Sequence, residues 1–265
     1  MRWVCERSYR HSPPSDIYLL VLHDLGLVHT DLKPENILLV NNDFDLVPLT
    51  KRANARKKRV LRDSEIRLID FGSATFNDEY HSQVVSTRHY RAPEIILRES
   101  FFSSCSAFMC MAADINYLAT AITIEMGWSF PCDAWSIGCI LIEFYTGEAL
   151  FQTHDNLEHL AMMETVLGLM PDDFRRKAET YRPGYFYAGR LDFPNAQTNK
   201  QSRKFVKAMK TIDQTVNSGV AYSKHDQRFI HLLKRLLTFD PAQRIRVDQA
   251  LKHPYFDLTA NEIPP

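Results

Sequence analysis

The segment 134–145, AWSIGCILIEFY, is apolar on almost every side of the helix that its spacing predicts. A helix of this kind is buried in the middle of a domain, because no face of it suits water. Pro131 and Asp133 stand just before it, where a helix start favours proline and an acidic side chain. We therefore expect a folded body built around this segment.

Helical spacing dominates the rest of the chain. The pattern predicts helices over 17–27, 157–167, 203–217 and 226–237, and a short one over 247–251. Two short apolar runs, 37–40 and 66–69, predict strands. No convincing strand pattern follows Gln83, so we expect a mainly helical body.

Whole-chain composition excludes several classes of protein. Lys and Arg total 32 against 32 Asp and Glu, and a chain without a basic excess is not a general nucleic-acid binder. The five cysteines are odd in number and form no C-x-x-C pair, which predicts a reducing compartment and no zinc ribbon. The first twenty residues hold Arg2, Glu6, Arg7 and Arg10 among their charged side chains and no apolar core of a signal peptide.

Two segments depart from this average composition. The block 51–62 is basic, and it is either a solvated loop or a nuclear-import signal. The segment 101–124 is largely apolar and long enough to cross a membrane. Serine, threonine and asparagine side chains lie in its middle, and their burial in lipid is costly. We expect no membrane span.

Three short motifs occur in a fixed order. The first is His29-Thr-Asp-Leu-Lys-Pro-Glu-Asn36, the second is Asp70-Phe-Gly72, and the third is Ala92-Pro-Glu94. Asp-Phe-Gly or Ala-Pro-Glu alone arises easily by chance, whereas all three motifs in this order and at this spacing do not. Together they resemble the catalytic loop, the metal-binding motif and the end of the activation segment of protein kinases.

The resemblance implies catalytic roles for three residues. Asp31 would accept or orient the proton of the substrate hydroxyl. Lys33 would place its ammonium beside the transferred phosphoryl group, as in serine/threonine-directed kinases. Thr87 matches the threonine that bonds both of these side chains from the loop before Ala92.

The same resemblance implies ATP and Mg²⁺ as cofactors. Asn36 and Asp70 would supply oxygen ligands to the metal, which bridges the ATP phosphates. The expected nucleotide contacts are Lys33, Asn36, Leu38 and Asp70.

Other matched residues have assembly roles in kinases. Glu94 and Arg244 resemble the buried pair that ties the activation segment to the lower lobe. Asp133 resembles the aspartate that holds the backbone of the catalytic loop, and His29 and Phe71 resemble two stacked residues of the hydrophobic spine.

One position departs from most kinases. Thr30 stands where an arginine usually pairs with a phosphate on the activation segment, and a threonine cannot form that ion pair. Activation by such a phosphate is therefore not expected.

Three longer stretches resemble a subfamily. Residues 86–94, 147–154 and 158–164 resemble the LAMMER, or CDC-like, kinases, and Glu158-His-Leu-Ala-Met-Met-Glu164 contains their signature. Thr165 replaces the final arginine of that signature. Membership implies a dual-specificity kinase that autophosphorylates on tyrosine and phosphorylates arginine-serine-rich splicing factors. The implied location is the nucleus, shared with the cytoplasm.

Part of a kinase domain is missing from the sequence. No G-x-G occurs among the nine glycines, and no V-A-x-K precedes Asp31, so we expect the N-terminal ATP lobe to be absent. The expected fold is α+β, mainly α: a kinase C-terminal lobe with short β-hairpins around the catalytic loop.

The expected organisation has four parts: a non-family segment 1–16, a C-lobe 17–257, an apolar non-family insert 99–125 within it, and a tail 258–265. A catalytically inactive lower-lobe fragment that binds a substrate or partner is the alternative function. For the chain alone, we expect no phosphotransfer.

Overall fold

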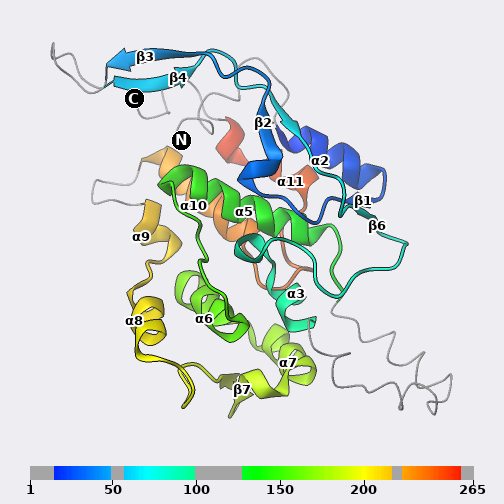
Figure 1. Cartoon of the computed structure of the whole chain (residues 1–265), viewed down its shortest axis with the longest axis vertical. Coiled ribbons are helices and arrows are strands. Elements are labelled where there is room, and N and C mark those ends of the chain that lie inside the picture. Colours follow the sequence, from blue (N-terminus) through cyan, green and yellow to red (C-terminus); the bar gives the residue numbers. More distant parts are fainter. Residues whose placement is uncertain (1–14, 49–56, 99–126, 217–222, 258–265) are drawn as a thin grey trace.

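The computed structural model describes residues 15–48, 57–98, 127–216 and 223–257. Helices are the main regular structure of this part of the chain and surround one continuous core (Figure 1). The α-helices are α2 (Ser15–Asp24), α3 (Pro93–Arg98), α5 (Pro131–Thr146), α6 (Asn156–Leu167), α7 (Asp172–Tyr181), α8 (Lys200–Ala208), α9 (Ile212–Val216), α10 (Lys224–Leu236) and α11 (Val247–Ala250). The 3-10 turns are η1 (Pro34–Asn36), η2 (Arg88–Tyr90), η3 (Pro183–Tyr185) and η4 (Pro254–Asp257).

Helix α5 is the central helix, as the apolar pattern over 134–145 predicts. It begins at Pro131, and it ends where Gly147 adopts a φ of 88°, a left-handed conformation that favours glycine. It packs against α10, and the approach is so close that a Cβ on Gly138 would lie 2.8 Å from Leu237. The lack of a side chain at Gly138 therefore sets the separation of α5 and α10.

All strands of the described residues form two-stranded antiparallel pairs. The pairs are β1 (Leu27–Val28) with β6 (Thr75–Phe76), β2 (Ile37–Leu39) with β5 (Ile66–Leu68), β3 (Phe44–Pro48) with β4 (Lys57–Leu61), and β7 (Phe186–Tyr187) with β8 (Arg190–Leu191). The prediction of strands in 37–40 and 66–69 is confirmed. Because β2 pairs with β5, the catalytic-loop motif and the D-F-G motif lie at the same end of one hairpin.

Two sequence predictions about strands are wrong. The pair β7–β8 lies beyond Gln83, where no strand was expected. The interpretation of the basic block as a loop fails for Lys57–Leu61, which form β4, with the guanidinium of Arg59 over the ring of Phe44 at 4.7 Å. The contact of Arg59 with Phe44 and the pairing with β3 stabilise β4, although the charged composition of this segment does not predict a strand.

Helix boundaries also differ from the sequence pattern. The helix expected over 203–217 is two helices, α8 and α9, because the chain turns extended at Met209. The helix expected over 17–27 is α2, which begins at Ser15 and is followed by the strand β1 at Leu27. The helix α7 has the composition of a charged surface helix, and the spacing did not single it out.

The LAMMER-like signature lies on α6. Leu160, Met162 and Met163 are fully buried, so this part of the signature fills the core. The hydroxyl of Thr165 donates to the carbonyl of Ala161 at 2.9 Å, a local bond within the helix. Thr165 therefore contacts its own helix, where the signature has an arginine.

A buried ion pair joins α3 to the C-terminal part of the chain. The guanidinium of Arg244 donates to both carboxylate oxygens of Glu94, at 2.7 and 2.9 Å, and both side chains are almost fully buried. The same guanidinium lies over the ring of Trp135, 5.1 Å from its centroid. The pairing expected for Glu94 and Arg244 is thus present.

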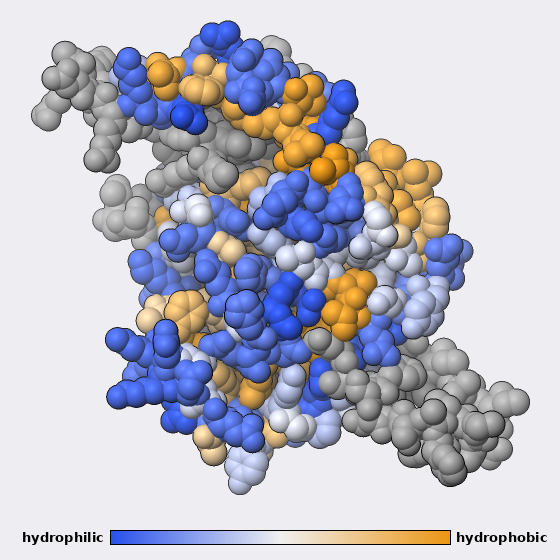
Figure 2. Space-filling model, viewed as in Figure 1, coloured by the Kyte–Doolittle hydropathy of each residue, from blue (hydrophilic) through white to orange (hydrophobic). Residues whose placement is uncertain are grey.

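The upper part of the molecule exposes apolar side chains. Figure 2 shows this apolar surface over β2 and the β3–β4 hairpin. Leu38, Leu46 and Phe71 are each about half exposed, at 47%, 56% and 45%.

Several predicted segments lie outside the described residues. They include most of the N-terminal segment 1–16, the apolar insert 99–125 and the tail 258–265. Within the described ranges, no helix combines the length and the hydropathy needed to cross a membrane.

Candidate active site

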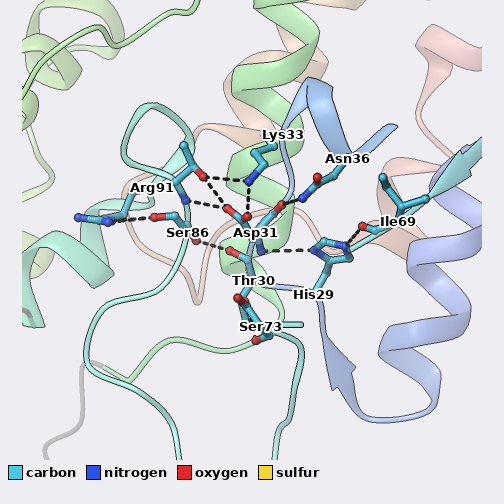
Figure 3. A network of polar contacts seen from close by, with 10 residues as sticks. His29, Thr30, Asp31, Lys33, Asn36, Ile69, Ser73, Ser86 and Arg91 are labelled. Atoms are coloured by element: carbon cyan, nitrogen blue, oxygen red, sulfur yellow. Dashed lines mark hydrogen bonds and ion pairs between the residues drawn. The ribbon is translucent and has the colours of Figure 1, made fainter. Parts of the chain in front are cut away.

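The motif His29–Asn36 forms the connection between β1 and β2, and its last three residues are η1 (Figure 3). Its backbone is held by Asp133, whose carboxylate accepts the N–H groups of His29 and Thr30, each at 2.9 Å. The imidazole of His23 lies 3.0 Å from the same carboxylate. Asp133 therefore has the position expected of the residue that fixes the loop, and α5 carries it there.

Asp31 lies at the centre of the polar network in Figure 3. One carboxylate oxygen accepts the backbone N–H of Thr87 at 2.9 Å and its hydroxyl at 2.7 Å. The other oxygen accepts the ammonium of Lys33 at 2.5 Å. The structure thus brings together the three residues that the sequence nominated as catalytic.

These contacts set the charge of the site. Burial by itself raises the pKa of Asp31, but the hydrogen bonds from Lys33 and Thr87 outweigh it, and the pKa is lowered. The hydrogen bond to Asp31 raises the pKa of Lys33, and the nearby charge of Asp70 adds to this. At neutral pH the site holds a carboxylate beside an ammonium, which is the protonation state that a proton acceptor requires.

Asn36 and Asp70 lie at the same end of the β2–β5 hairpin, Asn36 just before β2 and Asp70 just after β5. Asn36 is buried, and its amide nitrogen donates to the carbonyl of Asp31 at 2.9 Å. Its amide oxygen is thereby left as the acceptor. Asp70 is exposed with a φ of 64°, and within the described part of the chain its carboxylate makes no hydrogen bond to the other site residues.

This donor set fits Mg²⁺. The ion prefers oxygen ligands and is commonly held by one or two protein side chains together with water and substrate phosphates. The described ranges contain no group of three or more His, Cys, Asp and Glu side chains arranged for a metal. Two oxygen donors, the amide of Asn36 and the carboxylate of Asp70, are therefore what this site offers.

His29 and Phe71 contact each other, as the sequence indicated. Their ring centroids lie 5.1 Å apart, and the imidazole of His29 also lies 3.1 Å from the carbonyl of Ile69. Leu38, the predicted nucleotide contact on β2, is half exposed on the same upper surface.

A cleft of about 520 Å³ opens beside the carboxylate of Asp31. It lies between the segment after the D-F-G motif and the segment before Ala92, and is lined by Asp31, Gly72, Ser73, Ala74, Thr75, Ser82, Val84, Val85, Ser86, Thr87 and Arg91. Its polar lining is mostly hydroxyl groups, and Asp31 is the residue in it able to accept a proton at neutral pH.

The sequence assigned no role to three residues that organise this region. His23 contacts Asp133, Ser86 bonds to the catalytic loop, and Arg91 bonds to the chain just before Thr87. Ser86 and Arg91 belong to the stretch 86–94 that resembles the subfamily, and this was the only signal for them.

Comparison with known families gives a match along most of the chain. Residues 19–110 and 98–256 match the family model described as a protein kinase domain. The crystal structure of the PF14_0431 kinase domain is similar, with a TM-score of 0.70 and 30% identity over 96% of this chain and 69% of that one.

Curated relatives come from plants, fungi and animals. The serine/threonine-protein kinase AFC2 of Arabidopsis thaliana is 42% identical over 239 residues, 89% of this chain and 49% of the relative. The dual specificity protein kinase lkh1 of Schizosaccharomyces pombe is 44% identical over 89% of this chain and 30% of the relative. The dual specificity protein kinase CLK2 of Homo sapiens is 43% identical over 92% of this chain and 42% of the relative. The chain spans about half or less of the length of these relatives.

Proposed function

Because this chain belongs to the protein kinase family, with CDC-like dual-specificity kinases among its relatives, we propose that its site transfers the γ-phosphoryl group of ATP to serine and threonine hydroxyls. The observation that carries the proposal is the carboxylate of Asp31, ionised and fixed by Thr87 and Lys33 at the edge of an open cleft.

In this proposal Asp31 accepts the proton of the substrate hydroxyl while that oxygen forms its bond to phosphorus. The bond from phosphorus to the bridging oxygen of ADP breaks in the same transfer. Thr87 keeps the carboxylate oriented, and the ammonium of Lys33 offsets negative charge on the transferred group. An ionised carboxylate at the centre of the network is suited to this task.

The oxygen donors of Asn36 and Asp70 would hold Mg²⁺, whose chemistry is to bridge the ATP phosphates and neutralise their charge. The proposed nucleotide contacts on this chain are Lys33, Asn36, Asp70 and the exposed side chain of Leu38.

The finer parts of the proposal rest on the resemblance of the 86–94, 147–154 and 158–164 stretches. We propose arginine-serine-rich splicing factors as the protein substrates, tyrosine autophosphorylation as a second activity, and the nucleus as the place of action. The names of relatives such as lkh1 and CLK2, which include dual specificity, support the second of these.

A second candidate function is a binding module without catalysis. It is favoured by the absence of any G-x-G in the 265-residue sequence and by the exposed Leu38 and Phe71 on the nucleotide-facing surface. In kinases, backbone amides of a glycine-rich loop cover the ATP phosphates. A chain consisting of these residues alone would lack that cover.

One experiment separates the two functions. The 265-residue chain is assayed alone and joined at Ser15 to the upper lobe of human CLK2, with Mg-ATP and an arginine-serine repeat peptide. We expect no incorporation of phosphate by the chain alone and incorporation by the fusion. A lysine-serine repeat peptide of equal charge is the matched control for substrate choice.

The variant Asp31→Asn tests whether this chain supplies the base. In the fusion it should reduce incorporation by at least about 100-fold, the usual scale of a general base. Incorporation that survives Asp31→Asn would overturn the proposal. Peptide binding, measured by fluorescence anisotropy, without incorporation in either form would favour the binding module.

A further inference from the structure

Three residues of the site, Thr30, Asp70 and Ser86, have an unusual backbone conformation, and two of them contact each other. Thr30 in the catalytic loop has a φ of 69°, and Ser86, which precedes Thr87, has a φ of 67°. This left-handed region favours glycine, and a β-branched residue such as threonine is rarely found there. Such a conformation persists only where surrounding contacts enforce it, and enforced backbone is common at functional sites.

A hydrogen bond joins these two residues directly. The hydroxyl of Ser86 donates to the carbonyl of Thr30 at 2.6 Å, across 56 positions of sequence (Figure 3). The hydroxyl of Thr30 in turn donates to the carbonyl of Ser73 at 2.9 Å. The catalytic loop, the segment after the D-F-G motif and the segment before Ala92 are thereby joined through two hydroxyl groups.

Arg91 completes the arrangement. Its guanidinium donates to the carbonyl of Ser86 at 2.9 Å and to that of Val85 at 3.0 Å. Of the residues that line the cleft, Arg91 alone has a cationic side chain, and its guanidinium lies on these two carbonyls. Ser86 is therefore fixed twice, by its hydroxyl to the catalytic loop and by its carbonyl to Arg91.

The position of Ser86 decides the position of Thr87. Thr87 is the next residue, and both its N–H and its hydroxyl donate to one oxygen of Asp31. If the bond from Ser86 to Thr30 were lost, the turn that carries Thr87 would be held to the catalytic loop by the bonds of Thr87 itself, without the second attachment next to it. The chain of contacts thus runs from Thr30 through Ser86 and Thr87 to the carboxylate.

We propose that Ser86 is a positioning residue, and that its hydroxyl bond to Thr30 holds Thr87 against Asp31 without a phosphate on the activation segment. The role of Asp31 as the base rests on the proposed function, whereas the effect of Ser86 on Thr87 does not. The bond uses the backbone carbonyl of residue 30 and needs no charged side chain there, while the hydroxyl of Thr30 bonds to Ser73.

Hydrogen exchange at the Thr87 amide measures this directly, because that N–H donates to Asp31. The chain is treated with phosphatase, and exchange is compared between wild type, Ser86→Ala and Ser82→Ala. Ser82 is the matched control, because within the described ranges its hydroxyl donates to the carbonyl of Val84 in the same segment. We expect exchange at Thr87 to be at least about tenfold faster in Ser86→Ala and unchanged in Ser82→Ala.

Exchange in α5 reports whether each variant is folded. Should Ser86→Ala also loosen α5, Ser86→Gly replaces it, because glycine accepts a φ of 67° and also removes the hydroxyl, together with its Cβ. Slow exchange at Thr87 in either variant with α5 intact would overturn the proposal. So would wild-type protection at Thr87 that disappears on phosphatase treatment.

Kinetics of the fusion with an upper lobe add a second readout. Ser86→Ala should lower kcat about tenfold and leave KM for ATP unchanged, because Ser86 contacts the loop of Asp31 and no nucleotide-binding residue. A rise in KM for ATP with kcat unchanged would contradict a positioning role. If no form transfers phosphate, the proposed function fails, while exchange at Thr87 still decides the role of Ser86.

Discussion

All three nitrogen atoms of the Arg244 guanidinium donate hydrogen bonds in the interior. It donates to the two oxygens of Glu94 and to the carbonyls of Pro131, Thr238 and Phe239, at 2.7 to 3.2 Å. Neither Arg244 nor Glu94 has more than 1% of its side chain exposed. The variant Arg244→Leu removes all five bonds and leaves the Glu94 carboxylate buried without its ion pair.

The expected loss of stability is large. Removing one partner of a buried ion pair costs about 3–5 kcal/mol, because the remaining charge has no water to solvate it. For a chain of this size about 1 kcal/mol shifts Tm by roughly 2–4 °C, so Tm should fall by roughly 10 °C. Urea denaturation with circular dichroism, analysed by linear extrapolation, measures the free energy of unfolding.

Arg246→Leu is the matched control, two residues away. Its side chain is 75% exposed, and it pairs with Asp248 at 3.0 Å on the surface. Exposed pairs contribute about 0–1 kcal/mol, so this variant should unfold close to wild type.

A double variant separates the buried charge from the lost bonds. Glu94→Leu together with Arg244→Leu removes the unpaired carboxylate but leaves the carbonyls of Pro131, Thr238 and Phe239 without their donor. It should recover a substantial part of the loss, because apolar replacement of both ions is often close to neutral. The reasoning is refuted if Arg244→Leu costs no more than Arg246→Leu, or if the double variant is less stable than Arg244→Leu alone.

Two further predictions concern the core. Burial, with Arg88 and Arg91 nearby, lowers the pKa of His159 to about 3, below the ordinary 6.5. The unfolded chain therefore binds the extra proton, and stability is lost as pH falls from about 6.5 toward 3. Between about pH 7 and about pH 5 the free energy of unfolding of the wild-type protein should fall by about 2 kcal/mol through His159, and His159→Leu should remove this loss. Equal pH dependence of the wild type and the variant in urea denaturation would contradict this. A methyl group at Gly138 would lie 2.8 Å from Leu237, so Gly138→Ala should lower the free energy of unfolding by about 1–3 kcal/mol. An unchanged Tm would show that α5 and α10 can move apart freely.

The candidate residues of the site could be predicted from the sequence because the prediction depends on residue types at fixed short spacings. Asp31, Lys33 and Asn36 lie within one loop, so their separation along the chain fixes their separation in space to within a few ångströms. The helix α5 was equally readable, since a segment apolar on every side has to be buried.

Strands were predicted from the sequence less accurately than the central helix. The basic strand β4 was interpreted as a loop and the short pair β7–β8 was missed. A strand is stabilised by its neighbour across the sheet, so its own residues do not determine it. The contact of Arg59 with Phe44 appears only once the register of the two strands is known.

Only the tertiary structure decided how distant segments meet at Asp31. Asp133 accepts the amides of a loop 104 positions earlier, Arg244 meets Glu94 across 150 positions, and Ser86 meets Thr30 across 56. Each is a hydrogen bond between a side chain and a group whose place depends on how the helices pack. Hydrogen bonds act over about 3 Å, so a local sequence pattern cannot predict which distant residues will form them. The sequence by itself therefore determined which groups we propose as the chemical ones, and packing decided which residues hold them in place.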